Sequence, residues 1–169
     1  MTGDGIDDKQ AQDWLAQARQ VMDIETDALR LVRESLDTAF VQAVACILDH
    51  SGRLVVLGMG KSGIIAKKIA ATFASTGTPA FFVHAAEARH GDLGMITDHD
   101  VVLALSHSGE TEEVSSLLPT IKRLGASLIA ITGNPASTLG RYADIVLPVP
   151  VRQEACPMNL APKIGRAHV

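Results

Sequence analysis

Five short apolar runs recur along the chain after residue 53 and constrain its fold more than any other feature. Each run holds four or five residues, many of them β-branched or aromatic, at positions 54–57, 80–83, 101–105, 128–131 and 145–149. Continuous rather than alternating apolarity is typical of strands that are buried on both faces of a parallel sheet. Between most runs lie candidate crossover helices, at residues 62–75, 112–124 and 137–143. The sequence therefore predicts an α/β fold, a doubly wound sandwich around a five-stranded parallel sheet.

The first 52 residues have the pattern of two helices that precede the sheet. In the first helix, apolar residues recur at spacings of three, four or seven and form one stripe, at Trp14, Ala18, Val21, Ala28 and Val32. Asp37 or Thr38 can cap a second helix, whose apolar residues are Phe40, Val44, Ile47 and Leu48. We expect this segment to pack on the sheet or on a partner subunit.

Composition excludes several classes of protein. A chain of 169 residues with 47% hydrophobic and 20% charged residues can form one domain with a buried core. The net charge is −4 and no basic block is present, which argues against a nucleic-acid partner. No apolar stretch approaches the ~20 residues of a membrane helix, and the first residues lack the pattern of a secretory signal. Cys46 and Cys156 suggest neither a disulfide framework nor a zinc ribbon. We therefore expect a cytoplasmic domain without a membrane partner.

The segment 58–63, here called the lysine loop, follows the first predicted strand and is suited to binding an anion. It reads Gly58-Met59-Gly60-Lys61-Ser62-Gly63 and leads into a helix, whose first N–H groups and positive dipole end favour a negative ligand. A Walker A motif would need glycine where Val55 stands. The pattern formally matches a dinucleotide fingerprint, but no carboxylate that could hold a ribose follows the second strand, which argues against a nicotinamide cofactor.

A second candidate loop, residues 106–111, follows the third predicted strand and is called the hydroxyl turn. Ser106, Ser108 and Thr111 surround Gly109 at the start of a helix, and an ordinary helix cap needs only one hydroxyl. Glu110 and Glu112 are interpreted as charges that complement the N-terminus of that helix, although carboxylates beside a phosphate loop oppose anion binding. Ligands of such folds bind at the carboxyl ends of the strands where the strand order reverses. We therefore predict that both loops converge on a small, singly phosphorylated ligand.

Several longer stretches resemble the sugar isomerase (SIS) family, and within it the arabinose-5-phosphate isomerases. The resemblance covers roughly residues 54–162 and includes segments 58–63, 71–79, 90–95, 106–110 and 154–157. It implies the SIS fold, a flavodoxin-like three-layer sandwich, and a homotetramer. It also implies interconversion of D-arabinose 5-phosphate and D-ribulose 5-phosphate through an enediol, which supplies Kdo and lipopolysaccharide synthesis.

The same resemblance implies a set of site residues. Phosphate would be held by Ser62, Ser106, Ser108 and Thr111, catalysis would use Lys61, Glu113 and Glu154, and further substrate contacts would come from Gly77, Thr78, His84 and His90. No cofactor is required, and zinc would bind at His84 as an inhibitor. Other interpretations stay open: Lys61 as a phosphate counter-charge, Glu154 as a surface charge, and the two histidines as hydrogen-bonded loop residues, since zinc sites need three or four ligands.

The sequence also suggests how the chain divides into segments. We expect a helical segment at 1–52, a phosphosugar-binding SIS domain at 53–162 that is incomplete at its C-terminus, and a non-native tail at 163–169. Members of the family continue beyond this point, commonly into CBS domains, so we expect little isomerase activity from the 169-residue chain. The alternatives are a non-catalytic phosphosugar-sensing SIS module or another SIS isomerase, such as a hexulose-phosphate isomerase. The acidic residues 1–50 do not resemble the basic DNA-binding segment of a regulator.

Overall fold

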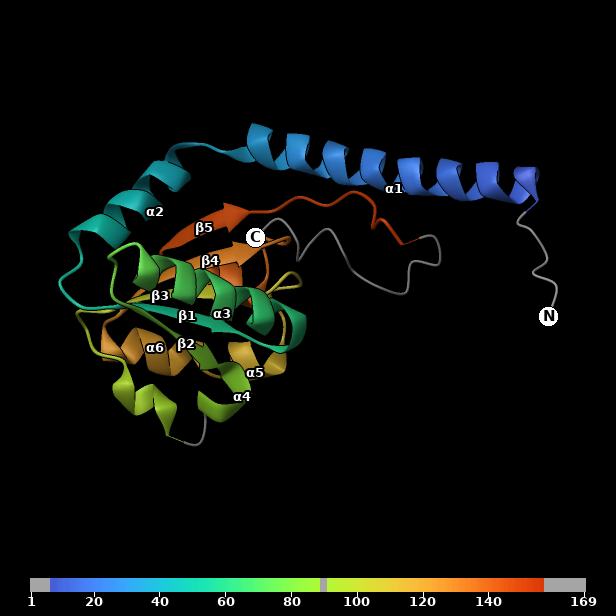
Figure 1. Ribbon diagram of the computed structural model, residues 1–169. Helices are drawn as coiled ribbons and strands as arrows, with labels where there is room; N and C mark the ends of the chain where they lie inside the picture. Colours follow the sequence, from blue (N-terminus) through green and yellow to red (C-terminus); the bar gives the residue numbers. More distant parts are fainter. Residues whose placement is uncertain (1–6, 89–90, 157–169) are drawn as a thin grey trace.

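A parallel sheet lies at the centre of the computed structural model, which describes residues 7–88 and 91–156 (Figure 1). Its five strands run in the order β2-β1-β3-β4-β5, and every neighbouring pair is parallel. The strands are β1 (Leu54–Gly58), β2 (Ala80–His84), β3 (Val101–Leu105), β4 (Ser127–Thr132) and β5 (Ile145–Pro148). The strand order therefore reverses between β1 and β3. The predicted α/β fold with a doubly wound five-stranded sheet is confirmed.

Helices cover both faces of the sheet and bury alternate residues of each strand. Val55 and Leu57 of β1 face a core formed with α4 (Ala85–Ala88), α5 (Glu112–Ser115), α6 (Leu118–Leu124) and α7 (Thr138–Tyr142). Leu54 and Val56 face the opposite core, formed with α2 (Thr38–Asp49) and α3 (Gly60–Ser75). A short 3₁₀ helix, η1 (Asp92–Met95), lies between α4 and β3. Burial on both sides explains the continuous apolarity of the strands.

The predicted crossover helix over residues 112–124 is divided in the structure. It consists of α5 and α6, and Pro119 lies at the start of α6. Proline has no backbone N–H and restricts the residue before it, so it favours the first turn of a new helix over the middle of a long one.

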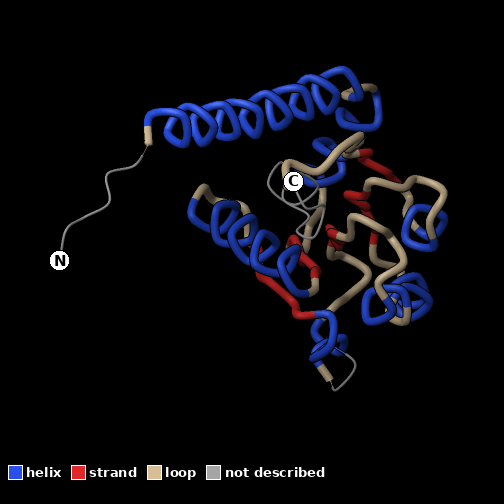
Figure 2. Tube along the Cα trace, turned by 90° about the vertical axis from the view of Figure 1, so that its right-hand side faces the viewer, coloured by secondary structure: helices blue, strands red, loops and turns tan. Residues whose placement is uncertain are grey.

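The two helices predicted before the sheet are confirmed, but their apolar residues are only partly buried. α2 packs on the sheet through Ala43, whereas α1 (Asp8–Ser35) lies outside the helix layers, as Figure 2 shows. The buried residue of α1 is Ala28, which packs near Ala155. Predicted stripe residues that stay exposed are Trp14, Ala18, Phe40, Val44 and Leu48. Among the helices of residues 7–88 and 91–156, none is both long and apolar enough to cross a membrane.

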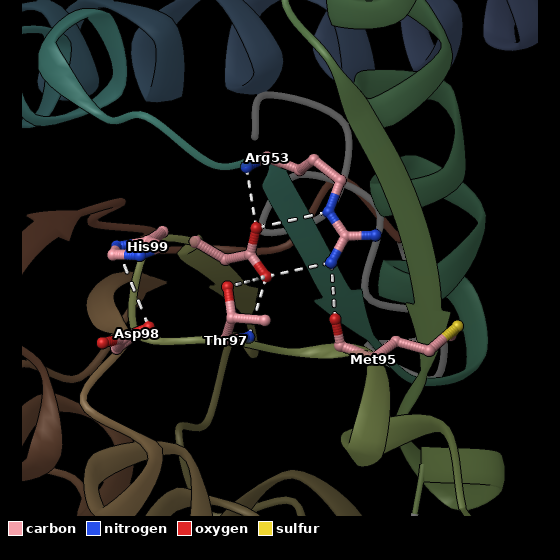
Figure 3. Close-up of polar contacts among 6 residues, drawn as sticks. Arg53, Met95, Thr97, Asp98 and His99 are labelled. Atoms are coloured by element: carbon pink, nitrogen blue, oxygen red, sulfur yellow. Dashed lines mark hydrogen bonds and ion pairs between the residues drawn. The ribbon is translucent and has the colours of Figure 1, made fainter.

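The buried carboxylate of Asp100 joins the amino ends of β1 and β3 (Figure 3). Asp100 is only 2% exposed. Its Oδ1 accepts hydrogen bonds from the backbone N–H of Arg53 at 2.7 Å and from Arg53 Nε at 3.3 Å. Its Oδ2 accepts from Arg53 Nη2 at 3.1 Å and from the N–H and hydroxyl of Thr97 at 2.8 and 3.1 Å. Burial raises the pKa of the Asp100 carboxyl, but the hydrogen bonds from Arg53 and Thr97 outweigh burial and lower it overall.

Asp100→Asn should lower the free energy of unfolding by about 2–3 kcal/mol, because the amide places N–H groups against the Thr97 and Arg53 donors. Chemical denaturation measures this loss. Asp98→Asn is the matched control: Asp98 is exposed and should cost less than about 0.5 kcal/mol. Because the folded-state pKa lies below 3.8, the stabilisation is present above that pH and is lost as the pH falls through the folded-state pKa. The two variants should therefore converge in acid, and equal losses at neutral pH would contradict the structure.

Candidate functional site

The lysine loop and the hydroxyl turn leave the sheet side by side. Gly58, the last residue of β1, pairs in register with Leu105, the last residue of β3. Ser62 and the buried Ser106 line one small hollow at this edge. The rest of its lining comes from Leu105, His107, Ile131, Thr132, Gly133 and Val149. The structure therefore brings the two loops together, as the sequence predicts.

Hydrogen bonds within the hydroxyl turn determine where its hydroxyl groups lie. Ser106 Oγ and Thr111 Oγ1 are 2.9 Å apart, and Ser106 Oγ also accepts from the N–H of Gly109 at 3.1 Å. Ser108 Oγ accepts from the N–H of Glu110 at 3.2 Å. A hydroxyl carries one hydrogen, so whichever of Ser106 and Thr111 donates in their mutual bond, the other keeps a hydrogen for a ligand. Ser108, which accepts in its bond, can donate to the same ligand.

The middle of the turn is packed closely against α7. Gly109 has φ +67°, and its carbonyl accepts from the N–H of Leu139 at 3.0 Å. A Cβ atom at Gly109 would lie 1.9 Å from Ser137 Oγ. Ser137 is the N-cap of α7 and its hydroxyl accepts from the N–H of Gly140. Both the backbone conformation and the lack of space therefore require glycine at position 109.

Glu110 lies in a different contact from the one that the sequence suggests. Its Oε1 accepts from the backbone N–H of Thr138 at 2.7 Å, at the first turn of α7, rather than complementing the helix that follows it. Hydrogen bonds from the hydroxyl and the N–H of Thr138 lower the pKa of the Glu110 carboxyl. Local sequence could not reveal this partner, because Thr138 is 28 residues away.

Lys61 and Glu113 both lie at the carboxyl edge of the sheet. Lys61 is the second residue of α3 and is exposed, and it follows Gly60, whose φ is +55°. Glu113 is in α5, which begins directly after the hydroxyl turn, and it is half-buried. The predicted cation is thus part of the lysine loop, and one predicted carboxylate directly follows the hydroxyl turn.

Glu154 lines a pocket of about 600 Å³ between α1 and the segment that follows β5. It is half-buried there, which disfavours its interpretation as a simple surface charge. His107 lines both this pocket and the hollow of Ser62 and Ser106. The pocket thus opens beside the hydroxyl turn, and Glu154 is part of its wall.

Sequence reasoning missed three residues that line the hollow: His107, Thr132 at the end of β4, and Gly133 directly after it. The Nδ1 atom of His107 is buried and has no hydrogen-bond partner among the described residues. A Cβ atom at Gly133 would lie 2.5 Å from His107 Cε1, so the glycine makes room for the ring. The sequence did hold a signal for Thr132. It directly follows the fourth predicted strand, and the carboxyl ends of neighbouring parallel strands lie at the same edge of the sheet.

Gly77 and Thr78 are not brought to this edge within one chain. They lie between α3 and β2, and Ala80 at the start of β2 pairs with Leu54 at the start of β1. α3 has 16 residues and returns the chain about 24 Å along the sheet. Within one chain, these two residues therefore lie at the amino edge, opposite the lysine loop and the hydroxyl turn.

His84 does lie at the carboxyl edge, where it pairs in register with Gly58. Its Nδ1 is buried without a hydrogen-bond partner among the described residues, and its ring meets the edge of Phe82 with centroids 6.3 Å apart. His90 lies outside the described residues. Residues 7–88 and 91–156 contain no group of three or more His, Cys, Asp or Glu side chains that could hold a metal ion. Zinc binding at His84 stays a prediction, and no step of the reaction is assigned to a metal.

A family model described as the SIS domain matches residues 47–164. The chain belongs to the SIS family. Over 150 residues, 89% of this chain and 46% of the relative, it is 56% identical to arabinose 5-phosphate isomerase KdsD of Pseudomonas aeruginosa. KdsD of Yersinia pestis is 52% identical over 158 residues, 94% of this chain and 46% of that protein.

A solved structure in the SIS family has nearly the same backbone. Escherichia coli CFT073 c3406 in complex with arabinose 5-phosphate superposes with a TM-score of 0.87 at 42% identity, over 93% of this chain and 84% of that one. By contrast, the chain spans about half the length of the curated relatives that it matches.

Gly109→Ala should lower the free energy of unfolding by roughly 3 kcal/mol or more, because it adds a steric clash with Ser137 to the cost of a positive φ. Gly77→Ala is the control, since Gly77 also has a positive φ (+101°) but no atom lies within 4 Å of its would-be Cβ. The control isolates the backbone cost of about 1–2 kcal/mol. Chemical denaturation measures both variants. If Gly109→Ala and Gly77→Ala lower the free energy of unfolding by the same amount, the close contact between Gly109 and Ser137 is absent.

Proposed function

We propose that this chain is the SIS domain of an arabinose 5-phosphate isomerase, which interconverts D-arabinose 5-phosphate and D-ribulose 5-phosphate. The observation that carries the proposal is the convergence of Ser62, which follows β1, and Ser106, which follows β3, on one small hollow at the carboxyl edge of the sheet. Relatives that are 56% and 52% identical carry the name of this isomerase. The similar c3406 structure, which holds arabinose 5-phosphate, supports a small phosphosugar as the ligand.

In this proposal the phosphate group binds between the two loops. Hydroxyl groups donate to its oxygens from Ser62, Ser106, Ser108 and Thr111. Bonds within the turn fix the Ser106, Ser108 and Thr111 hydroxyls before the ligand arrives, which reduces the entropy lost on binding. The N-terminus of α3 adds a favourable dipole, since this helix has 16 residues and begins at the loop.

The isomerisation moves one proton between C1 and C2 of the sugar through an enediol. In the direction from aldose to ketose, a carboxylate removes the proton from C2, and the C1 carbonyl oxygen gains negative charge and takes up a proton to give the enediol. The C2 hydroxyl then loses its proton to become the new carbonyl, while a proton is returned to C1. Lys61, the second residue of α3, would stabilise the negatively charged oxygen with its positive charge. Glu113 and Glu154 would share the proton transfers, and their half-buried positions near the hydroxyl turn support this division.

The homotetramer belongs to the proposal as well. Gly77 and Thr78 lie at the edge of the sheet away from the crevice, so a role for them in substrate binding requires a second subunit. Exposed apolar side chains on α1 and α2 offer a surface for such contacts, among them Trp14, Met22, Val41 and Leu48. His84 at the carboxyl edge and His90 would complete the substrate contacts.

The cellular role follows from the proposed reaction. The isomerase would work in the cytoplasm and supply arabinose 5-phosphate to Kdo and lipopolysaccharide synthesis. It would need no cofactor, and inhibition by zinc through His84 stays a prediction. A hexulose-phosphate isomerase or a phosphosugar sensor would instead show turnover of another sugar phosphate, or binding without turnover.

Lys61→Ala should lower kcat/KM for arabinose 5-phosphate by about 10³-fold, because the developing oxygen charge loses its partner. The assay follows formation of ribulose 5-phosphate by the full reading frame that contains this chain. Lys67→Ala is the matched control, an exposed lysine on the same helix, and should leave the rate unchanged. Full activity of the Lys61 variant, or turnover of hexulose 6-phosphate in preference, would refute the proposed reaction.

Glu113→Gln and Glu154→Gln should each slow turnover by about 10²–10⁴-fold, the usual contribution of a general acid or base. Incubation in D₂O separates their roles. The variant that lacks the carbon base should stop deuterium exchange into recovered arabinose 5-phosphate, whereas the other should still allow exchange. If both variants keep wild-type rates of turnover and exchange, neither glutamate transfers the proton.

A further inference from the structure

Two hydrogen bonds from α7 hold the middle of the hydroxyl turn. The N–H of Leu139 donates to the carbonyl of Gly109 at 3.0 Å. The N–H of Thr138 donates to Glu110 Oε1 at 2.7 Å. The first contact uses the backbone of the turn, whereas the second depends on one side chain. Of these two hydrogen bonds, only the one to Glu110 can be removed by changing the side chain that accepts it.

Each hydroxyl of the turn is connected to this anchored segment. The N–H of Gly109 donates to Ser106 Oγ, and the N–H of Glu110 itself donates to Ser108 Oγ. Thr111, the partner of Ser106, is the next residue along the chain. A shift of residues 109–110 would therefore change the positions of the three hydroxyl groups together.

We propose that Glu110 is a positioning residue for the substrate, because its contact with Thr138 holds the hydroxyl turn in the geometry that binds a phosphate monoester. This inference rests on the proposed phosphosugar function. Glu110 acts through the turn and does not touch the ligand. A carboxylate aimed at a phosphate would repel it, whereas in this structure the carboxylate oxygen is directed to the N–H of Thr138.

The state of the Glu110 carboxyl agrees with this role. The Thr138 hydrogen bonds, and the charge of Arg141 to a smaller degree, lower its pKa, so the group is ionised at neutral pH. An ionised carboxylate is a strong acceptor for a backbone N–H. The amide of glutamine keeps the oxygen acceptor without the charge, whereas alanine removes both.

The test compares Glu110→Ala, Glu110→Gln and the control Glu112→Gln in the full reading frame that contains this chain. Glu112 is exposed in the same region and makes the same charge change. Glu110→Ala should raise KM for arabinose 5-phosphate and the inhibition constant of inorganic phosphate together, by about tenfold, while kcat falls less than about threefold. Glu110→Gln should restore both constants to within about threefold of wild type. Glu112→Gln should change neither.

The readouts separate this inference from a general loss of structure and from the function itself. A fall in thermal stability and kcat, with an unchanged phosphate inhibition constant, would overturn the positioning role. So would constants for Glu110→Ala that stay within about twofold of wild type, although the isomerase function would then stand. A wild-type protein that neither converts arabinose 5-phosphate nor binds inorganic phosphate would remove the proposed function and this inference with it.

Discussion

The parallel pairing of β1 with β3 determines how the lysine loop and the hydroxyl turn lie relative to each other. At the amino ends of these strands, the buried carboxylate of Asp100 accepts hydrogen bonds from Arg53 and Thr97. At the carboxyl ends, Gly58 faces Leu105, and the two loops follow. A slip of one residue in this register would move one loop about 3.3 Å along the other and reverse the faces of the β3 side chains. A polar cluster at one edge thus helps to fix the geometry of the opposite edge.

Sequence alone was sufficient for features that depend on local pattern and general topology. The continuous apolar runs predict strands covered on both faces, and Val55, Leu57 and Val56 do face two separate cores. The convergence of Ser62 and Ser106 follows from a rule on where parallel sheets bind ligands, so no knowledge of individual contacts was needed. The division of residues 112–124 into two helices was also present in the sequence, since Pro119 disfavours a continuous helix.

Contacts between distant segments could not be predicted, because their residue types are common and carry no spacing signal. The partner of Glu110 comes from α7, and the partner of Asp100 comes from the residue before β1. The apolar stripe of α1 was recognised, but sequence could not show that Trp14 would be exposed while Ala28 is buried. The place of Gly77 and Thr78 at the amino edge is a different case. It follows from the predicted helix at 62–75 and strand at 80–83, because a crossover helix returns the chain to the amino ends of a parallel sheet.

The hydroxyl turn raises an electrostatic problem, because carboxylates stand beside a loop that is suited to binding an anion. Glu110 resolves part of it, since its carboxylate accepts hydrogen bonds from the backbone N–H and the hydroxyl of Thr138. The energetic cost of a carboxylate near a phosphate is thereby reduced, while the carboxylate contributes to holding the turn. Glu113 follows the turn in α5 and is half-buried two residues after Thr111, so in the proposed function it would place a second carboxylate near the phosphosugar. A carboxylate there would oppose binding of the phosphate. Its proposed role as the base that removes a proton from the sugar would give a physical reason for keeping it there.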